Sequence, residues 1–479
     1  MKVSRLASLA AVSLVLAFTA QASSRPRYGG TAHVVLRDRV NTLDPLGEED
    51  HPATRDRMMA LVFEGLTSMD AEGRLRPGLA TWWQSDANKR VWHFHLRLAQ
   101  FHDGSALTAS DAVASLQRSM SEWKITATDR QTISIDATAP APHLPELLAL
   151  PRFAIAKKTP ENTLFGTGPY KFSEWQPGER LVLTTNDDYW GGRPFPDAIE
   201  FQMGVPLRDQ LLERQLGPYA AAELTVDQVR SLEQSSQNVM ISRQSDLFAI
   251  VFLQTDDASA TRGRKPVDPR IREALANTVN RNAITNVILQ KRAAAASGLL
   301  PQWLTGYESL FPANSNIDRA KELRSETAAL IIIPPIALAY DASEPTSKLL
   351  AERIALDARE AGIVVQPFGE AHVGNKQARS SLNADAVLVR LPLASTEPSI
   401  ALAARMDEMG LLPEHAAFNV RADQPEQLFD LESKTLQSFR VIPIAHASQA
   451  VWLSPVTHNW QLSPTGTWQL DQLWVEGAR

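Results

Sequence analysis

Three histidines stand close together early in the chain and form the first candidate chemical site. His93 and His95 alternate along a predicted strand over 91–96, so their side chains share one face, and His102 follows after a turn. Imidazoles at this spacing can bind zinc. No carboxylate with ligand spacing accompanies them, so the sequence favours ordinary strand histidines over a metal site.

Motifs for nucleophilic catalysis and for phosphate binding are missing from the sequence. It contains no Gly-x-Ser-x-Gly elbow, no Walker A loop and no dinucleotide fingerprint. It also contains no cysteine, which excludes thiol catalysis, thiolate metal sites, disulfides and an N-terminal lipidated cysteine. We therefore expect a protein that is not an enzyme, with no catalytic residue, no metal and no cofactor.

The length, composition and charge of the chain limit its domain organisation and its partners. A chain of 479 residues exceeds one compact core and suits two or three lobes. Hydrophobic residues make up 44% and charged residues 21%, as in ordinary globular proteins. The formal net charge of -6 gives no reason to expect a nucleic-acid partner, which would call for a basic patch.

The N-terminus has the order of segments found in a secretory signal peptide. Lys2 and Arg5 precede an almost wholly small or apolar stretch at 6–20, and a small-residue cleavage site ends at Ala22. The apolar stretch is shorter than the roughly 20 residues that span a bilayer. We expect residues 1–22 to be removed before Ser23, which leaves a protein of the periplasm that is not membrane-embedded.

Strand and helix patterns alternate along most of the chain and predict a mixed α/β protein. Thr108 is a suitable N-cap for a helix, with Asp111 at its third position. A β-α-β unit is predicted over 336–365, with its helix capped by Ser343 and ended by Gly362.

Short blocks of residues, in a fixed order along nearly the whole chain, carry a resemblance to a known family. They are Phe63-Glu64-Gly65-Leu66-Thr67, Trp92-His93-Phe94-His95-Leu96-Arg97, Phe101-His102-Asp103-Gly104, Gly166-Thr167-Gly168-Pro169-Tyr170, Asn186 to Gly192, Pro269 to Ala283, Gly298-Leu299-Leu300-Pro301 and Val441-Ile442-Pro443-Ile444. In type, spacing and order they resemble the family 5 extracytoplasmic solute-binding proteins. That family includes the oligopeptide-, dipeptide- and nickel-binding proteins of ABC importers.

The resemblance implies a two-lobed α/β fold of the periplasmic binding protein type (class II, large type). An inserted subdomain and a hinge cleft that closes on a solute belong to this fold. The expected segments are a signal peptide at 1–22, a first lobe at 23–49, 165–250 and 443–479, an inserted subdomain at 50–164, and a second lobe at 251–442.

The same resemblance places five residues around the cleft: Glu49, Gly168, Arg390, Ala394 and His446. Glu49 follows Leu43-Asp44-Pro45, in a position similar to a ligand-contacting loop of the family. For Gly168, turn chemistry favours a link between the lobes over ligand contact. His446 is the polar ring where family members often carry tyrosines.

Ala394 marks a departure from the family pattern. Peptide-binding members have an aspartate there that pairs with the ligand's α-ammonium, and an alanine cannot do so. Glu397 is an alternative acid, although its position matches a turn acid of the pattern. Arg390 is an added base that favours carboxylate or phosphate if it faces the cleft, and has no such role if it faces solvent. These changes predict a shift towards anionic or neutral solutes.

The function implied is capture of a peptide or peptide-like solute by a monomer that delivers it to the permease subunits of an ABC importer. A divergent sensor or chaperone-like binding protein on the same fold is the alternative, because a fold does not fix a function.

Export gives the first testable prediction. N-terminal sequencing of the protein from the periplasmic fraction should begin at Ser23, because signal peptidase cleaves after the small-residue site that ends at Ala22. Recovery of intact Met1 from a membrane pellet would contradict it.

Overall fold

The computed structural model describes residues 25–47, 49–161, 163–205, 219–234, 238–253, 265–307, 309–312, 314–379, 381–412 and 424–476. The predicted signal peptide lies outside these residues. In the described part, no helix combines the length and the apolar character needed to cross a bilayer.

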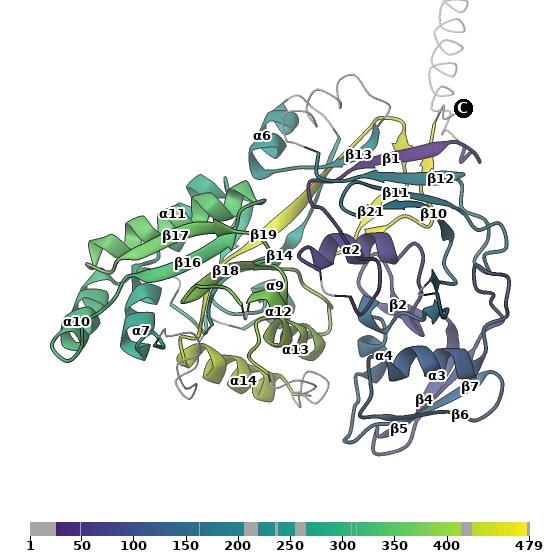
Figure 1. The fold of residues 1–479 in the computed structure, drawn as a ribbon, viewed down its shortest axis with the longest axis horizontal. Helices are drawn as coiled ribbons and strands as arrows, with labels where there is room; N and C mark the ends of the chain where they lie inside the picture. Colours follow the sequence, from purple (N-terminus) through teal and green to yellow (C-terminus); the bar gives the residue numbers. More distant parts are fainter. Residues whose placement is uncertain are drawn as a thin grey trace, which may run out of the picture.

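Two long antiparallel strands, β14 (Val239–Phe252) and β19 (Val441–Leu453), connect the two halves of the molecule (Figure 1). They lie in the middle of a mixed sheet of order β10-β11-β12-β1-β13-β19-β14-β18-β16-β17, with β15 beside β19. The other strands are β1 (Thr31–Val35), β10 (Tyr170–Gln176), β11 (Arg180–Thr185), β12 (Ala198–Gln202), β13 (Tyr219–Glu223), β15 (Ala293–Ala295), β16 (Ile336–Asp341), β17 (Val365–Glu370) and β18 (Ala386–Leu391).

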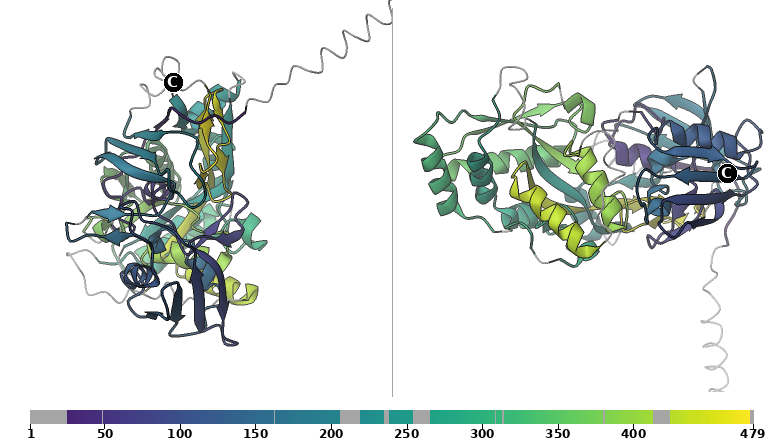
Figure 2. Two further views of the ribbon diagram at one scale, coloured as in Figure 1. Left: turned by 90° about the vertical axis from the view of Figure 1, so that its right-hand side faces the viewer. Right: turned by 90° about the horizontal axis from the view of Figure 1, so that it is seen from below.

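The neighbours of β14 and β19 change along their length. The last residues of β19 pair with β13, whereas the second half of β14 pairs with β18. One end of the two-stranded ribbon therefore belongs to the first lobe and the other end to the second lobe. Seen from below in Figure 2, the green second lobe stands beside the blue and purple first lobe and its subdomain.

The first lobe has its own apolar core beneath β1, β10, β11 and β12. Residues after 453 return to this core, where Trp460 and Trp468 are buried. They form two short strand pairs, β20 (Thr457–His458) with β23 (Trp474–Val475), and β21 (Gln461–Leu462) with β22 (Trp468–Gln469). The helix α6 (Val226–Gln234) lies beside β14.

A separate core of the inserted subdomain extends from Leu66 to Ile155. Its main sheet has the order β4 (Ala80–Ser85), β5 (Val91–Leu96), β7 (Thr132–Asp136) and β6 (Lys124–Ala127). Its helices are α3 (Ala109–Gln117), α4 (Leu144–Leu147) and η1 (Pro151–Phe153). Two further strand pairs are β2 (Thr67–Met69) with β3 (Leu75–Pro77), and β8 (Lys157–Lys158) with β9 (Leu164–Phe165). The predicted start at residue 50 is too early, because α2 (Pro52–Met59) buries Met58 and Met59 in the first-lobe core.

The start of α3 confirms the predicted capping. The backbone N–H of Asp111 donates to the Thr108 hydroxyl, and the Asp111 carboxylate accepts from the Thr108 N–H, which forms a capping box.

The β-α-β unit of the second lobe is also confirmed, with β16 and β17 parallel and α11 (Pro345–Glu360) between them. Gly362 adopts φ +73 just after the helix, as its stop signal requires. The predicted cap is wrong by one residue. The Ser343 hydroxyl donates to Asp341 at 2.6 Å, and the Glu344 carboxylate caps the helix by accepting from the Thr346 N–H.

The remaining helices of the second lobe cover its sheet. They are α7 (Pro269–Thr278), α8 (Arg281–Ala283), the π-turn η3 (Ile284–Ile288), α9 (Gln302–Thr305), α10 (Ile317–Ala328), α12 (Lys376–Arg379), α13 (Pro398–Glu408) and α14 (Pro425–Gln437).

Three buried side chains hold the segment 298–300 of the second lobe. Glu432 of α14 accepts from the N–H groups of Leu299 and Leu300, and Arg405 of α13 donates to the carbonyl of Leu299. The Nε2 of His446 lies 3.2 Å from the carbonyl oxygen of Gly298, so it must carry the proton. Burial lowers the pKa of His446 to about 3 and raises that of Glu432 to about 6.

The buried His446 predicts a loss of stability in acid. From about pH 6.5 towards 3, the unfolded chain takes up a proton that the folded ring refuses, so the free energy of unfolding falls as the pH falls. His446→Gln keeps a donor for Gly298 but cannot titrate. The free energy of unfolding, measured with urea at a series of pH values, should depend less steeply on pH in the variant. The difference between the two pH slopes should be up to about 1.4 kcal/mol per pH unit.

Glu432 titrates in both proteins, so its contribution cancels in this comparison. Identical slopes for wild type and His446→Gln would contradict the prediction.

Candidate functional site: a cavity between the lobes

A cavity of about 380 Å³ lies between the two lobes and the inserted subdomain. This volume is at the lower end of the range of small-molecule sites, about 300–1,000 Å³. The walls come from α2 and the residues after it, the β2–β3 hairpin, residues 149–151, Tyr189 and Trp190, the segment 392–396 after β18, and residues 463–471 of the C-terminal return.

One wall is organised around the carboxylate of Glu64. It accepts hydrogen bonds from the Thr167 hydroxyl at 2.7 Å, from the Tyr189 hydroxyl at 2.9 Å and from the Trp190 indole at 3.0 Å. The guanidinium of Arg97 stacks on Trp190, 3.4 Å from the ring centre. Residues from four of the sequence blocks thus meet around one carboxylate.

Arg57 connects the opposite wall with the central strands. Its guanidinium is buried and donates to the side chains of Glu223 in β13 and Gln449 in β19. It also lies 4.8 Å from the ring centre of Trp468. Gln449 in turn donates to Asp246 of β14 at 2.8 Å. A residue that lines the cavity is therefore linked to three strands of the central sheet.

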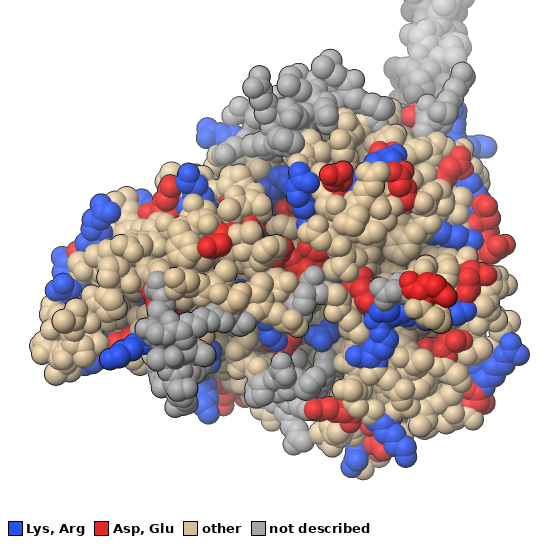
Figure 3. Space-filling model, in the orientation of Figure 1, with Lys and Arg blue, Asp and Glu red and all other residues tan. Residues whose placement is uncertain are grey.

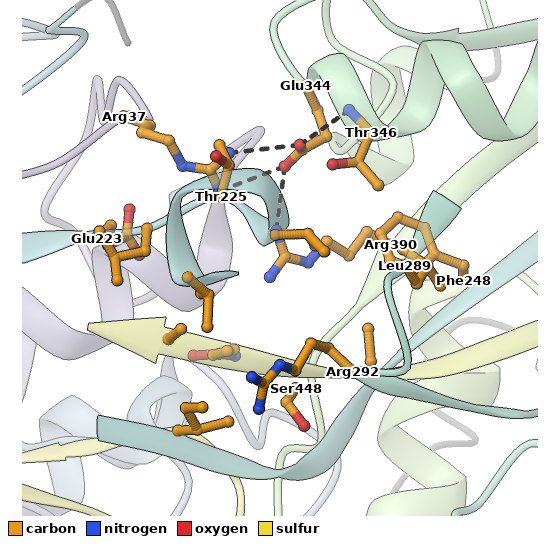
Figure 4. A pocket seen from close by; sticks show the side chains of 17 residues that line it. Arg37, Glu223, Thr225, Phe248, Leu289, Arg292, Glu344, Thr346, Arg390 and Ser448 are labelled. Atoms are coloured by element: carbon orange, nitrogen blue, oxygen red, sulfur yellow. Dashed lines mark hydrogen bonds and ion pairs between the residues drawn. The ribbon is translucent and has the colours of Figure 1, made fainter. Parts of the chain in front are cut away.

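A partly buried charge network lies beside these strands, and we call Arg37, Asp246, Glu344 and Arg390 the hinge network. Arg390 donates from Nε to Asp246 at 2.9 Å and from Nη1 to Glu344 at 3.1 Å. Arg37 of the first lobe approaches the same Glu344 at 3.4 Å. Figure 4 shows Glu344 between the two arginines, at the edge of a small cavity of about 50 Å³.

The electrostatics of the hinge network favour the charged forms of Arg390 and Glu344. Burial works against the charge of Arg390, but Asp246 and Glu344 hold its pKa above the ordinary value. Burial likewise opposes ionisation of Glu344, and Arg37 and Arg390 outweigh it, so the pKa of Glu344 is lowered. The carboxylate is thus shared between a first-lobe and a second-lobe cation.

Contacts between uncharged groups also join the second lobe to the rest of the molecule, so the structure shows the closed form. The Thr396 hydroxyl of the second lobe donates to the carbonyl of Gly73 in the subdomain at 2.6 Å. Gly374 of the second lobe packs so tightly on Asp50 that a Cβ at this position would overlap the Asp50 carbonyl oxygen.

Of the five residues expected around the cleft, Ala394 lines the large cavity and is exposed to it. Arg390 lines two smaller cavities beside the hinge. Glu49 is buried and accepts from the N–H groups of its own loop, at 2.7 Å from Asn41. The carbonyl of Gly168 accepts from Asn186, and His446 is buried under segment 298–300.

The expectation that Arg390 attracts an anionic solute required a guanidinium facing the cleft without partners. Two carboxylates instead surround it. Its charge is already balanced inside the protein, so the prediction of an anion preference loses its basis. The side chain serves the contact between the lobes.

The three early histidines do not converge. His95 stacks on Trp82 with ring centres 5.5 Å apart, and His102 Nε2 lies 3.1 Å from the Gly168 carbonyl. Burial lowers the pKa of His102 to about 4. Within the described ranges there is no group of three or more His, Cys, Asp or Glu that could hold a metal ion.

Two lobes on a shared pair of strands, closed over a cavity that both of them line, define a hinged solute-binding protein. Residues 74–404 match the model of the family described as "Bacterial extracellular solute-binding proteins, family 5 Middle". The chain belongs to this family.

Curated relatives agree with this assignment. The periplasmic oligopeptide-binding protein OppA of Escherichia coli is 24% identical over 376 residues, which cover 68% of this chain and 68% of that protein. The probable deoxycholate-binding periplasmic protein YgiS of Escherichia coli is 26% identical over 348 residues, 64% of this chain and 62% of YgiS.

Solved structures share the fold. NikA from Staphylococcus aureus in complex with Ni(L-His)2 superposes with a TM-score of 0.78 at 19% identity, over 94% of this chain and 100% of that one. The oligopeptide-binding protein AppA from Bacillus subtilis, in complex with a nonapeptide, gives 0.79 at 16% identity over the same shares.

Close packing at Gly374 predicts that an added methyl group hinders closure. Gly374→Ala should cost the closed form about 1–3 kcal/mol, the usual cost of overpacking. Small-angle X-ray scattering should then show a larger radius of gyration than for wild type. Gly410→Ala is the control: its φ of +68 strains an alanine locally, but a Cβ there meets nothing within 4 Å, so this change destabilises the chain without touching the contact between the lobes. Superimposable scattering curves for all three proteins would contradict this account of closure.

Proposed function

We propose that this protein captures a peptide or a peptide-like solute between its lobes and delivers it to the permease subunits of an ABC importer. The observation that carries the proposal is the cavity of about 380 Å³, whose walls come from both lobes. Relatives are described as binding oligopeptides, murein peptides, deoxycholate or nickel, so family membership alone leaves the solute class open.

The mechanism we propose is closure by shared contacts. A solute that touches both Ala394 of the second lobe and Trp468 of the first lobe gains its full set of contacts in the closed form alone. It therefore shifts the equilibrium towards closure by its differential affinity for the two forms. The permease then recognises the relative position of the lobes.

Members of the family are binding proteins, and we propose that this chain is exported, acts as a monomer and performs no catalysis. Its selectivity resides in the side chains that line the cavity.

Native mass spectrometry of protein purified from the periplasm tests the proposal. We expect a retained solute of peptide-like mass that dissociates when the protein is unfolded. Gly374→Ala, which hinders closure, should retain less of it, whereas Gly410→Ala should retain as much as wild type. Absence of a retained solute, together with no rise in melting temperature on addition of a peptide library, would refute the proposal.

A further inference from the structure

Ion contacts of two kinds join the second lobe to the rest of the molecule. In the first kind the base is an arginine, which keeps its charge at neutral and mildly acidic pH. Arg37 lies 3.4 Å from Glu344, and Arg152 lies 3.5 Å from Asp407. In the second kind the base is a histidine. On the face that Figure 3 shows, acidic and basic side chains are interspersed over both lobes, so individual contacts carry the electrostatic part of closure there.

The first histidine contact joins the second lobe to the first lobe. The Nδ1 of His372 lies 2.6 Å from a carboxylate oxygen of Asp50. The other carboxylate oxygen of Asp50 is buried without a hydrogen-bond partner among the described residues. The backbone of His372 has φ +63, a left-handed conformation that is uncommon for residues other than glycine. This strained residue is thus held against the facing lobe, two positions before the close contact of Gly374 with Asp50.

The second histidine contact joins the second lobe to the inserted subdomain. The Nδ1 of His143 lies 3.8 Å from a carboxylate oxygen of Glu397, which directly follows the cavity-lining segment 392–396. Glu146, in α4, has a buried carboxylate oxygen that lacks a hydrogen-bond partner in the described part. Burial raises the pKa of Glu146, and the charge of Glu397 adds to this rise, whereas His143 opposes it. One imidazole therefore stands between two acids that repel each other across the interface.

Histidine is the base in these contacts whose charge changes between about pH 8 and about pH 5. A protonated imidazole attracts a facing carboxylate much more strongly than a neutral imidazole does. When the lobes separate, His372 loses Asp50 and His143 loses Glu397. Protons on the two histidines therefore stabilise the closed form more than the open form. A proton on Glu146 acts in the same direction, because it removes the repulsion from Glu397.

We propose that closure of the lobes is coupled to proton uptake at His143 and His372, so that the protein closes more readily on its solute as the pH falls from about 8 to about 5. The arginine contacts supply the part of closure that does not depend on pH. Because linkage is reciprocal, a solute that closes the lobes also makes the protein take up protons. The coupling goes beyond the proposed function, since it concerns the conditions of capture and applies to any solute that the cavity holds.

The other charged groups around His372 do not oppose this coupling. His51 adjoins Asp50, but it lies 3.8 Å from Asp38 within the same lobe, and this contact does not break on opening. Lys376 lies 2.7 Å from Asp407, also within one lobe.

Acids beside Asp50 keep their charge over this pH range. Asp38 and Glu344 line the small cavity next to it. Burial works against their charge, but nearby bases outweigh it and hold both pKa values below the ordinary value. They therefore add a constant background, and the change with pH comes from the histidine contacts.

Distances between two spin labels on the mature chain, freed of retained solute, test the proposal. The chain contains no cysteine, so Leu98→Cys in the subdomain and Ile332→Cys in the second lobe supply two unique attachment sites. The native side chains there are 84% and 94% exposed, so the labels disturb no core. Double electron–electron resonance should show the closed distance gaining population from about pH 8 to about pH 5. The closed-to-open ratio should rise roughly twofold to fivefold for each histidine contact, the usual strength of exposed ion pairs.

His372→Asn and His143→Gln remove the titration, and asparagine tolerates the left-handed backbone at position 372. Each single variant should lose part of the pH response, and the double variant most of it. Asp50→Asn changes the other side of the first contact. It should reduce the response as His372→Asn does and add nothing when the two are combined. His33→Gln is the matched control, because His33 lies 3.5 Å from Glu200 within the first lobe, and it should respond like wild type.

The same distance distribution at both pH values, in the labelled chain with all histidines intact, would overturn the proposal. So would a response that falls by less than about half when His143 and His372 are both replaced, or an equal loss in His33→Gln. No solute enters this measurement, so its failure would leave the proposed function standing.

Discussion

The shared carboxylate of Glu344 is the constraint on which the closed molecule depends. A buried carboxylate is costly unless cations and hydrogen bonds compensate it, and its two cations belong to different lobes. When the lobes separate, Arg37 departs and Arg390 remains with Glu344 and Asp246. The hinge network thus favours closure, but leaves no charge of the second lobe unpaired when the lobes open. The strands β14 and β18 position Asp246 and Arg390, and the start of α11 positions Glu344.

The fold could be predicted where its signals are local. The capping box at Thr108, the stop at Gly362 and the strand–helix–strand order over 336–365 depend on a few neighbouring residues, and the structure contains each of them. The predicted cap at Ser343 failed because two adjacent residues can both serve as a cap. The side chain that lost this competition bonds back to Asp341.

The site was harder to predict because its partners are distant in sequence. Ala394 could be placed in the cavity, since it follows a recognisable strand. The role of Arg390 could not be predicted, because Asp246 lies 144 positions away and Glu344 lies 46 positions away. One signal was present: Arg390 is the single charge in the otherwise apolar strand β18, and an arginine in such a position is usually paired when it is removed from solvent.

The continuous strands β14 and β19 have a consequence for how the molecule unfolds. Each lobe uses the same two strands as the border of its half of the sheet. If either lobe were lost, the other would retain a strand edge without hydrogen-bond partners, which is unfavourable and prone to aggregation. Removal of either lobe therefore exposes a long strand edge that the intact sheet keeps paired, which links the stability of each lobe to the presence of the other.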